Sequence, residues 1–183
     1  MHKSQGARLT CLLFRFEYAQ VAPTPLREAR WNSVPKELVI LIADDDSGHA
    51  RLIEKNLERS GLHNPVLRFE NGQEILDFLF CRGDGLKRAA DTPYLLLLDI
   101  RMPKIDGVEV LRQVKADPEL RKMPVSILTT TDDPREVARC HELGCGNYIV
   151  KPVDYEKFSE AIKQLGLFIS LVQVPELDGQ PVR

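Results

Sequence analysis

The sequence predicts an α/β protein built on a doubly wound, five-stranded parallel sheet. From Leu38 onward, short apolar runs alternate with segments of helical periodicity, which is typical of parallel strands joined by crossover helices. Residues 38–42 and 94–98 contain no charged residue, so we expect strands that are covered on both faces. Acidic, hydroxyl or basic residues follow four of the five runs, at the edge where such sheets bind ligands.

The first strand-helix unit begins with the strand predicted at 38–42. Ser47 is the expected N-cap of a helix that reaches Ser60, and Gly61 follows where that helix should end. Three apolar residues at helical spacing predict its buried face: Ala50, Ile53 and Leu57.

Four further units follow in the same order. A strand at 66–69 precedes a helix capped by Asn71, whose expected core residues are Ile75, Leu76 and Leu79. A polar connection at 81–93 then leads to the central strand, 94–98, and a helix at 108–115. The last two strands are predicted at 125–128 and 148–150, and their helices at 134–143 and 154–169.

Charge divides the chain of 183 residues unevenly. Residues 1–36 hold six Lys/Arg and two Asp/Glu, a net charge of +4, whereas residues 37–183 carry a net charge of -6. Pro23, Pro25 and Pro35 interrupt any helix in the first segment. We therefore predict a basic N-terminal extension or a mis-set start at 1–36, one domain at 37–172 and a C-terminal tail at 173–183.

Composition favours a cytoplasmic protein. No apolar run reaches the roughly 20 residues that a membrane-spanning helix needs. The apolar segment 9–16 is cut short by Arg15 and Glu17 and has no small-residue cleavage site, so export is not expected. The four cysteines form no CxxC pair and no zinc pattern, and we interpret them as reduced thiols. The overall charge of -2 gives no case for nucleic acid or a membrane as the main partner.

The residues that follow the strands form a chemically specific set. They are Asp44 to Asp46 after the first strand, Asp99 after the third, Thr129 to Thr131 after the fourth and Lys151 after the fifth. Clustered carboxylates suit Mg²⁺, which binds through one or two carboxylates together with phosphate oxygens. A carboxylate beside such an ion can attack phosphorus, with an ammonium and a hydroxyl group as further partners of the phosphoryl group. Asp99 is the expected nucleophile.

Four segments resemble the receiver domains of response regulators in two-component systems: LVILIADDDSGHARLI, LLLLDIRMPKIDGVEVL, PVSILTTTDD and GNYIVKPV. The resemblance covers about residues 38–170 and implies a flavodoxin-like (βα)5 fold. It implies phosphorylation of Asp99, with Lys151 at the phosphoryl group and Thr129 and Tyr148 as switch residues. It also implies Mg²⁺, or Mn²⁺ as a substitute, bound by Asp44, Asp45, Asp99 and the Arg101 backbone carbonyl.

The same resemblance implies further properties of the site. Arg101 and Thr131 are the expected determinants of slow autodephosphorylation, and a cis peptide bond is expected before Pro152. Asp46, the remaining member of the acidic triplet, is interpreted as a loop residue or a helix N-terminal carboxylate. Asp106 and Gly107 are interpreted as turn residues that shape the site.

Only a short segment follows the receiver-like region, so the expected output is contact with another protein rather than an attached effector domain. The long connection at 81–93 and the end of the last helix resemble stand-alone receivers that partner phytochrome-type histidine kinases. The expected partners are a sensor histidine kinase and a downstream protein or phosphotransfer partner, and a homodimer is left open.

Three other functions compete with this hypothesis. A degenerate receiver would bind partners without phosphorylation, although the key positions here carry the expected residue types. An aspartyl-nucleophile phosphohydrolase would need a second Asp two positions after the nucleophile, where this chain has Arg101. A nucleotide-binding protein would need a glycine-rich loop after the first strand, which is absent from this sequence. We therefore expect a phosphoacceptor rather than an enzyme.

Overall fold

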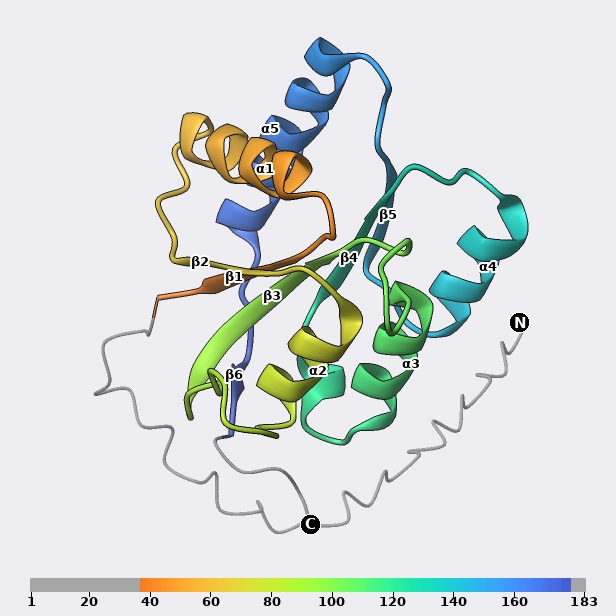
Figure 1. Cartoon of the computed structure of the whole chain (residues 1–183). Helices are drawn as coiled ribbons and strands as arrows, with labels where there is room; N and C mark the ends of the chain where they lie inside the picture. The colour runs from red at the N-terminus through yellow and green to blue at the C-terminus, as the bar shows by residue number, and fades with distance from the viewer. Residues whose placement is uncertain (1–36, 179–183) are drawn as a thin grey trace, which may run out of the picture. The chain divides into compact units, whose positions relative to one another are not determined.

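The computed structural model describes residues 37–178, which form one sheet with helices on both faces (Figure 1). Five strands are parallel in the order β2-β1-β3-β4-β5. The central β3 lies between β1 and β4, as its apolar sequence predicts. The strands are β1 (Val39–Ala43), β2 (Val66–Phe69), β3 (Thr92–Leu98), β4 (Val125–Thr129) and β5 (Asn147–Val150).

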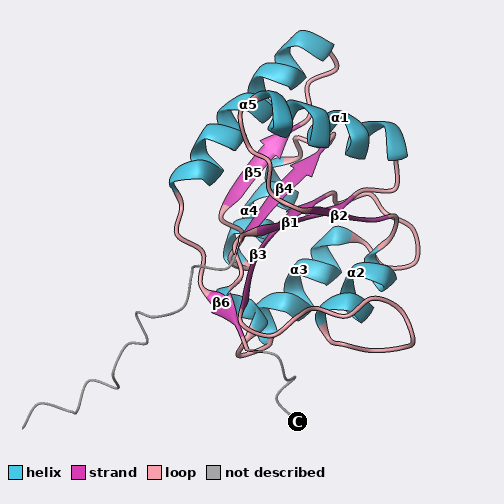
Figure 2. Ribbon diagram, turned by 90° about the vertical axis from the view of Figure 1, so that its left-hand side faces the viewer, coloured by secondary structure: helices cyan, strands magenta, loops and turns pink. Residues whose placement is uncertain are grey.

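The helices cover the sheet on both sides. Helices α1 and α5 pack on one face, and α2 and α3 cover the other, where Cys140 of α4 also joins the core (Figures 1 and 2). This arrangement confirms the predicted doubly wound fold. The helices are α1 (Ser47–Arg59), α2 (Gly72–Leu79), α3 (Gly107–Ala116), α4 (Pro134–Glu142) and α5 (Tyr155–Leu171), and the short 3₁₀ helix η1 (Leu120–Lys122) precedes β4.

Strand geometry explains why the central strands are apolar along their whole length. Successive side chains of a strand point to opposite faces. Leu95 and Leu97 of β3 therefore pack with α1 and α5, whereas Leu96 and Leu98 pack with α2 and α3. The strand ends where its first carboxylate, Asp99, begins the loop at the carboxyl edge of the sheet.

Each of the five α-helices begins after an Asp or Asn whose side chain accepts a backbone N–H of the first turn. Asn71 caps α2 as predicted. The prediction for α1 was wrong by one residue, because Asp46 is the N-cap and accepts from the N–H groups of Gly48 and His49. Asp46 thus uses its carboxylate to begin a helix. The five caps are Asp46, Asn71, Asp106, Asp133 and Asp154.

A sixth strand, β6 (Glu176–Leu177), pairs antiparallel with the first two residues of β3. Leu177 is fully buried there. The buried guanidinium of Arg88 donates hydrogen bonds to the carbonyls of Leu79 and Asp178, and the Asp178 N–H donates to Glu119 Oε1 at 2.8 Å. Residues 173–178, which the sequence assigned to a tail, thus contact the body of the protein. The predicted extension, 1–36, lies outside the described residues.

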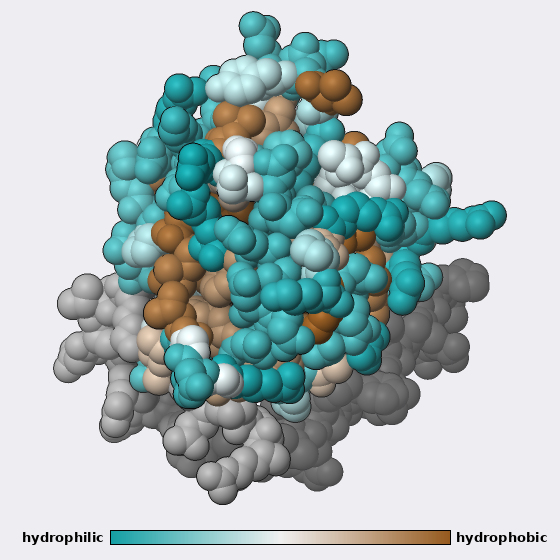
Figure 3. Space-filling view, in the orientation of Figure 1, coloured by the Kyte–Doolittle hydropathy of each residue, from teal (hydrophilic) through white to brown (hydrophobic). Residues whose placement is uncertain are grey.

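Hydrophilic residues cover most of the face seen in Figure 3, and apolar residues appear there in separate areas, the longest of them a vertical band on the left. The large apolar side chains that are exposed within residues 37–178 include Val153 and Tyr155 after β5, and Leu167, Phe168 and Leu171 on α5. Among the described helices we find none with the length and apolar character needed to cross a bilayer.

Candidate phosphoryl-accepting site

Lys151 joins two carboxylates at the carboxyl edge of the sheet. Its Nζ atom lies 2.7 Å from Asp44 Oδ2 and 2.7 Å from Asp99 Oδ2, and all three side chains are buried. These residues follow β5, β1 and β3, which are adjacent or nearly adjacent in the sheet, so parallel strands bring them together. A buried ammonium between two carboxylates offsets their mutual repulsion and fixes Asp99 in place.

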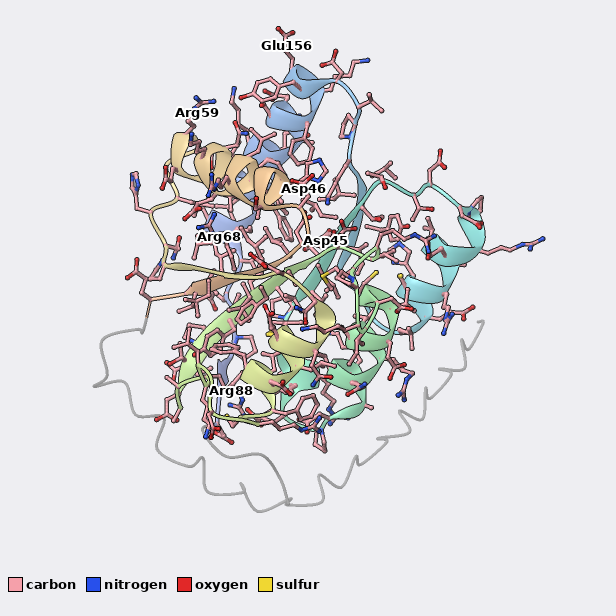
Figure 4. All side chains as sticks on the ribbon, in the orientation of Figure 1. Asp45, Asp46, Arg59, Arg68, Arg88 and Glu156 are labelled. Carbon is pink, nitrogen blue, oxygen red and sulfur yellow. The ribbon has the colours of Figure 1, made fainter. Side chains whose placement is uncertain are left out.

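A third carboxylate completes the acidic cluster. Oxygen atoms of Asp44, Asp45 and Asp99 all lie within 4.8 Å of one another. Asp45 is exposed, and Figure 4 shows it in the loop at the end of β1, beside Asp46 at the start of α1. The cluster is thus closed beneath by the sheet and open on the side of Asp45.

The pKa values of Asp44 and Asp46, the two neighbours of Asp45, shift in opposite directions. Burial raises the pKa of Asp44 above its ordinary value, although the charge of Lys151 opposes this. For Asp46, backbone N–H groups of His49 and Gly48 lower the pKa of the exposed carboxyl. Asp46 also donates its own N–H to Asp44 Oδ1 at 3.0 Å, so it supports the cluster from outside.

Thr129 lies at the end of β4 next to Lys151, whose backbone N–H donates to the Thr129 carbonyl at 2.6 Å. The hydroxyl of Thr129 is fully buried and has no hydrogen-bond partner among the described residues. A buried polar group without a partner is costly, typically by about 1–3 kcal/mol. Such a group at a ligand site is available to a ligand oxygen.

Tyr148 is half-buried on β5, and its hydroxyl donates to the Thr131 carbonyl at 3.1 Å. This bond links β5 to the loop between β4 and α4, which begins directly after Thr129. Burial, and next the charge of Glu136, raises the pKa of Tyr148 to about 12, so the phenol remains a donor at neutral pH. The predicted switch residues Thr129 and Tyr148 are therefore both connected to the β4–α4 loop. Their hydroxyl groups form no hydrogen bond with each other.

Arg101 lies two residues after Asp99 and has an exposed side chain. Its backbone N–H donates to Asp99 Oδ1 at 3.3 Å, and its guanidinium pairs with Glu136 of α4 at 3.2 Å. The predicted role of its backbone carbonyl as a metal ligand stays a prediction. Glu136 was missed by sequence reasoning, because its place in the first turn of a helix is equally explained by the helix dipole.

Gly107 was interpreted from sequence only as a turn residue. In the structure a Cβ atom at this position would lie 2.0 Å from the Asp99 carbonyl oxygen. The expected cis peptide bond before Pro152 is not found: no peptide bond in residues 37–178 is cis. That correction accords with the general preference of X–Pro bonds for the trans form.

The model of the response regulator receiver domain family matches residues 40–163. The chain belongs to this family. A receiver domain from Rhodospirillum rubrum has a solved structure with 48% identity and a TM-score of 0.72, covering 77% of this chain and 99% of that one.

Two further relatives carry informative names. Response regulator Rcp1 of Synechocystis is 33% identical over 62% of this chain and 76% of its own length. Its Mn²⁺-bound structure has a TM-score of 0.68 and covers 75% of this chain and 98% of that one. The phosphorylated cyanobacterial phytochrome response regulator RcpA is 29% identical with a TM-score of 0.69, covering 76% of this chain and 99% of that one. The resemblance to the phytochrome-associated subgroup is thus confirmed.

Receivers of this family are phosphorelay signalling proteins rather than classical enzymes, and they bind divalent metals. The acidic cluster fits a divalent cation chemically, because it offers three carboxylates, two of them buried and one exposed to solvent. Asp44, Asp45 and Asp99 are the residues of this receiver that would hold such an ion.

Proposed function

We propose that this receiver accepts a phosphoryl group on Asp99 from a sensor histidine kinase and signals by protein contact. The observation that carries the proposal is the buried bridge from Lys151 to both Asp44 and Asp99, at 2.7 Å each. It holds the Asp99 carboxylate in a fixed position at the open edge of the sheet, with a cation beside the oxygens that a phosphoryl group would occupy.

In the proposed transfer, an Asp99 oxygen forms a new bond to phosphorus as the bond between phosphorus and the kinase histidine nitrogen breaks. The electron pair of that bond remains on the imidazole. Lys151 donates to the phosphoryl oxygens, and the free hydroxyl of Thr129 gains its missing partner there. Mg²⁺ bound by Asp44, Asp45, Asp99 and the Arg101 carbonyl, with Mn²⁺ as a substitute, would neutralise charge on the transferred group.

The output of the proposed reaction is a change in the β4–α4 loop. When Thr129 turns toward the phosphoryl group, the loop that Tyr148 holds through the Thr131 carbonyl changes its packing. We assign Arg101 and Thr131 to slow autodephosphorylation, because the resemblance to receiver domains implies this role for the residues two positions after Asp99 and Thr129. Tyr148 then reports phosphorylation to the surface formed by α4, β5 and α5, a population shift between two packings.

A hollow beside Lys151 supports kinase docking at this edge. It has a volume of about 330 Å³, and its lining includes Val153 and Tyr155, which are exposed, and Phe158, which is buried. A phytochrome-type histidine kinase is the proposed donor, because the chain resembles RcpA and Rcp1. We also propose a downstream protein or phosphotransfer partner, a cytoplasmic location and no binding to nucleic acid or membrane. The choice between a monomer and a homodimer stays open.

The deciding experiment exposes the purified protein to a small phosphodonor with Mg²⁺ and measures its intact mass. We expect a gain of one phosphoryl group that is lost in Asp99→Asn and retained in Asp91→Asn, an exposed carboxylate remote from the site. Equal gain in wild type and Asp99→Asn would exclude Asp99 as the acceptor. No gain in any protein would favour the phosphorylation-independent binding module. Profiling with purified histidine kinases then identifies the donor.

A further inference from the structure

Arg101 contacts two different parts of the molecule. Through its backbone N–H it touches Asp99 Oδ1, and through its guanidinium it touches Glu136 Oε2 of α4 at 3.2 Å. The Arg101 side chain is 65% exposed, whereas that of Glu136 is 16% exposed. The ion pair therefore extends from the loop after the phosphoacceptor to a carboxylate that is held against the protein.

Glu136 is well placed to hold the guanidinium. It lies in the first turn of α4, where the helix dipole stabilises a negative charge, and it is mostly covered by its surroundings. Its charge also acts on Tyr148, the residue whose hydroxyl is bonded to the Thr131 carbonyl. Glu136 thus pairs with a residue that contacts Asp99 and acts electrostatically on a residue that is bonded to the β4–α4 loop.

We propose that Glu136 is a positioning residue that holds the Arg101 guanidinium on α4, and that a phosphoryl group on Asp99 competes with Glu136 for this guanidinium. The inference rests on the proposed function and adds the partner exchange to it. A phosphoryl group presents three acceptor oxygens and up to two negative charges, and a guanidinium binds such a group at least as well as a single carboxylate. Arg101 is anchored at Asp99 by its own backbone, so its side chain need only turn.

The exchange couples phosphorylation to α4. Before phosphorylation the ion pair ties the β3–α3 loop to the first turn of α4. After phosphorylation, α4 loses this ion pair, and the β4–α4 loop changes its packing as Thr129 turns toward the phosphoryl group. Since coupling is reciprocal, anything that draws Glu136 away from Arg101 favours the phosphorylated form, and anything that strengthens the pair opposes it.

The test measures the equilibrium affinity of Asp99 for beryllofluoride, a phosphoryl analogue, in the presence of Mg²⁺. In Glu136→Gln, no ion pair has to break before the Arg101 guanidinium reaches the ligand. We therefore expect beryllofluoride to bind roughly twofold to fivefold more tightly, the range typical of an ion pair with an exposed partner. Glu142→Gln, at the other end of α4, changes the net charge equally and should bind as the wild type does.

A double-mutant cycle separates the exchange from simple charge repulsion. In an Arg101→Gln background, Glu136→Gln should no longer change the affinity, because the guanidinium that carries the coupling is absent. An equal effect of Glu136→Gln in both backgrounds would overturn the inference, as would wild-type affinity in Glu136→Gln. The Arg101 Nε resonance should shift on beryllofluoride binding in the wild type, and by less in Glu136→Gln, where no carboxylate partner is exchanged.

The same experiment distinguishes failure of the inference from failure of the proposed function. Beryllofluoride should not bind Asp99→Asn. If the wild type also fails to bind it, both the phosphoacceptor function and the partner exchange are overturned. If the wild type binds and Asp99→Asn does not, an unchanged affinity in Glu136→Gln overturns only the exchange.

Discussion

Gly107 packs against the backbone of Asp99 so closely that a Cβ atom at 107 would lie 2.0 Å from the Asp99 carbonyl oxygen. The Gly107 N–H also donates to the Ile100 carbonyl at 2.9 Å, which fixes the start of α3 beneath the loop. The position of Asp99, the proposed phosphoacceptor, therefore depends on a residue that bears no reactive group.

Gly107→Ala should consequently destabilise the protein and displace Asp99. Overpacking of this kind costs about 1–3 kcal/mol, and the added methyl meets backbone rather than a flexible side chain. Urea unfolding measures the stability, and phosphoryl uptake from a small phosphodonor measures the site. Gly85→Ala is the matched control, since a Cβ there would contact nothing within 4 Å. Unchanged phosphoryl uptake in Gly107→Ala would contradict the close packing.

Lys151→Met should weaken the fold most strongly when no divalent metal is present. Removing one partner of a buried ion pair typically costs about 3–5 kcal/mol, and here two buried carboxylates lose their shared cation. Mg²⁺ should recover part of the loss by neutralising Asp44 and Asp99. Urea unfolding in EDTA and in Mg²⁺ tests this, with the exposed Lys157→Met as control. An equal loss under both conditions would argue against a metal at the acidic cluster.

The raised pKa of Asp44 predicts that the free energy of unfolding of the metal-free protein depends on pH. Burial raises the pKa of this carboxyl above its ordinary value of 3.8, so the folded state holds the proton more tightly than the unfolded state. The contribution of Asp44 is therefore fully present below about pH 3.8 and is lost as the pH rises through the raised pKa. Relative to Asp44→Asn, the wild type should lose stability over that interval. Urea unfolding in EDTA at several pH values measures the difference, and parallel curves would refute it.

Thr129→Val should stabilise the unphosphorylated protein and impair the proposed switching. Valine has nearly the same shape and removes a buried hydroxyl that lacks a partner, so we expect a gain of about 1 kcal/mol in the free energy of unfolding. Thr92→Val is the control: its hydroxyl donates to the Ala90 carbonyl at 3.0 Å, and its removal should destabilise. If Thr129→Val is as destabilising as Thr92→Val, the Thr129 hydroxyl has a partner in solution.

Leu177→Ala should show that β6 belongs to the folded domain. The side chain is fully buried at the first residues of β3, and truncation of a buried leucine typically costs about 2–5 kcal/mol. Glu176→Ala, on the exposed neighbour in the same strand, should have little effect. Chemical unfolding compares them. Equal stability of the two variants would mean that β6 does not stay paired.

The fold could be predicted because its signals are local and repeated. Each strand has its own apolar run, and the alternation with helical segments requires crossover connections, so a parallel sheet with helices on both faces follows from general rules. Its flavodoxin-like type came from the resemblance to receiver domains. The cluster of Asp44, Asp99 and Lys151 followed for the same reason, since the carboxyl ends of parallel strands share one edge. The location of Asp99 at the carboxyl edge of the sheet could thus be predicted from the sequence alone.

The remaining features depend on distances between side chains. Nothing in the sequence pairs Arg101 with Glu136, which lies 35 positions later in the chain. The strand β6 has only two residues, too few to show a period of two, and its burial depends on the first residues of β3. Ser47 and Asp46 are both good N-caps, and only the loop geometry selects Asp46.

The pairing of β6 with the beginning of β3 has a practical consequence for binding assays. Because Asp99 follows the other end of β3, Asp178 lies at the opposite end of that strand from Asp99. A surface linker or fluorescent protein fused directly after Asp178 is attached away from the edge at which we propose that a kinase docks. A tag placed directly after Asp178 is accordingly the attachment to use when kinases are screened against this receiver.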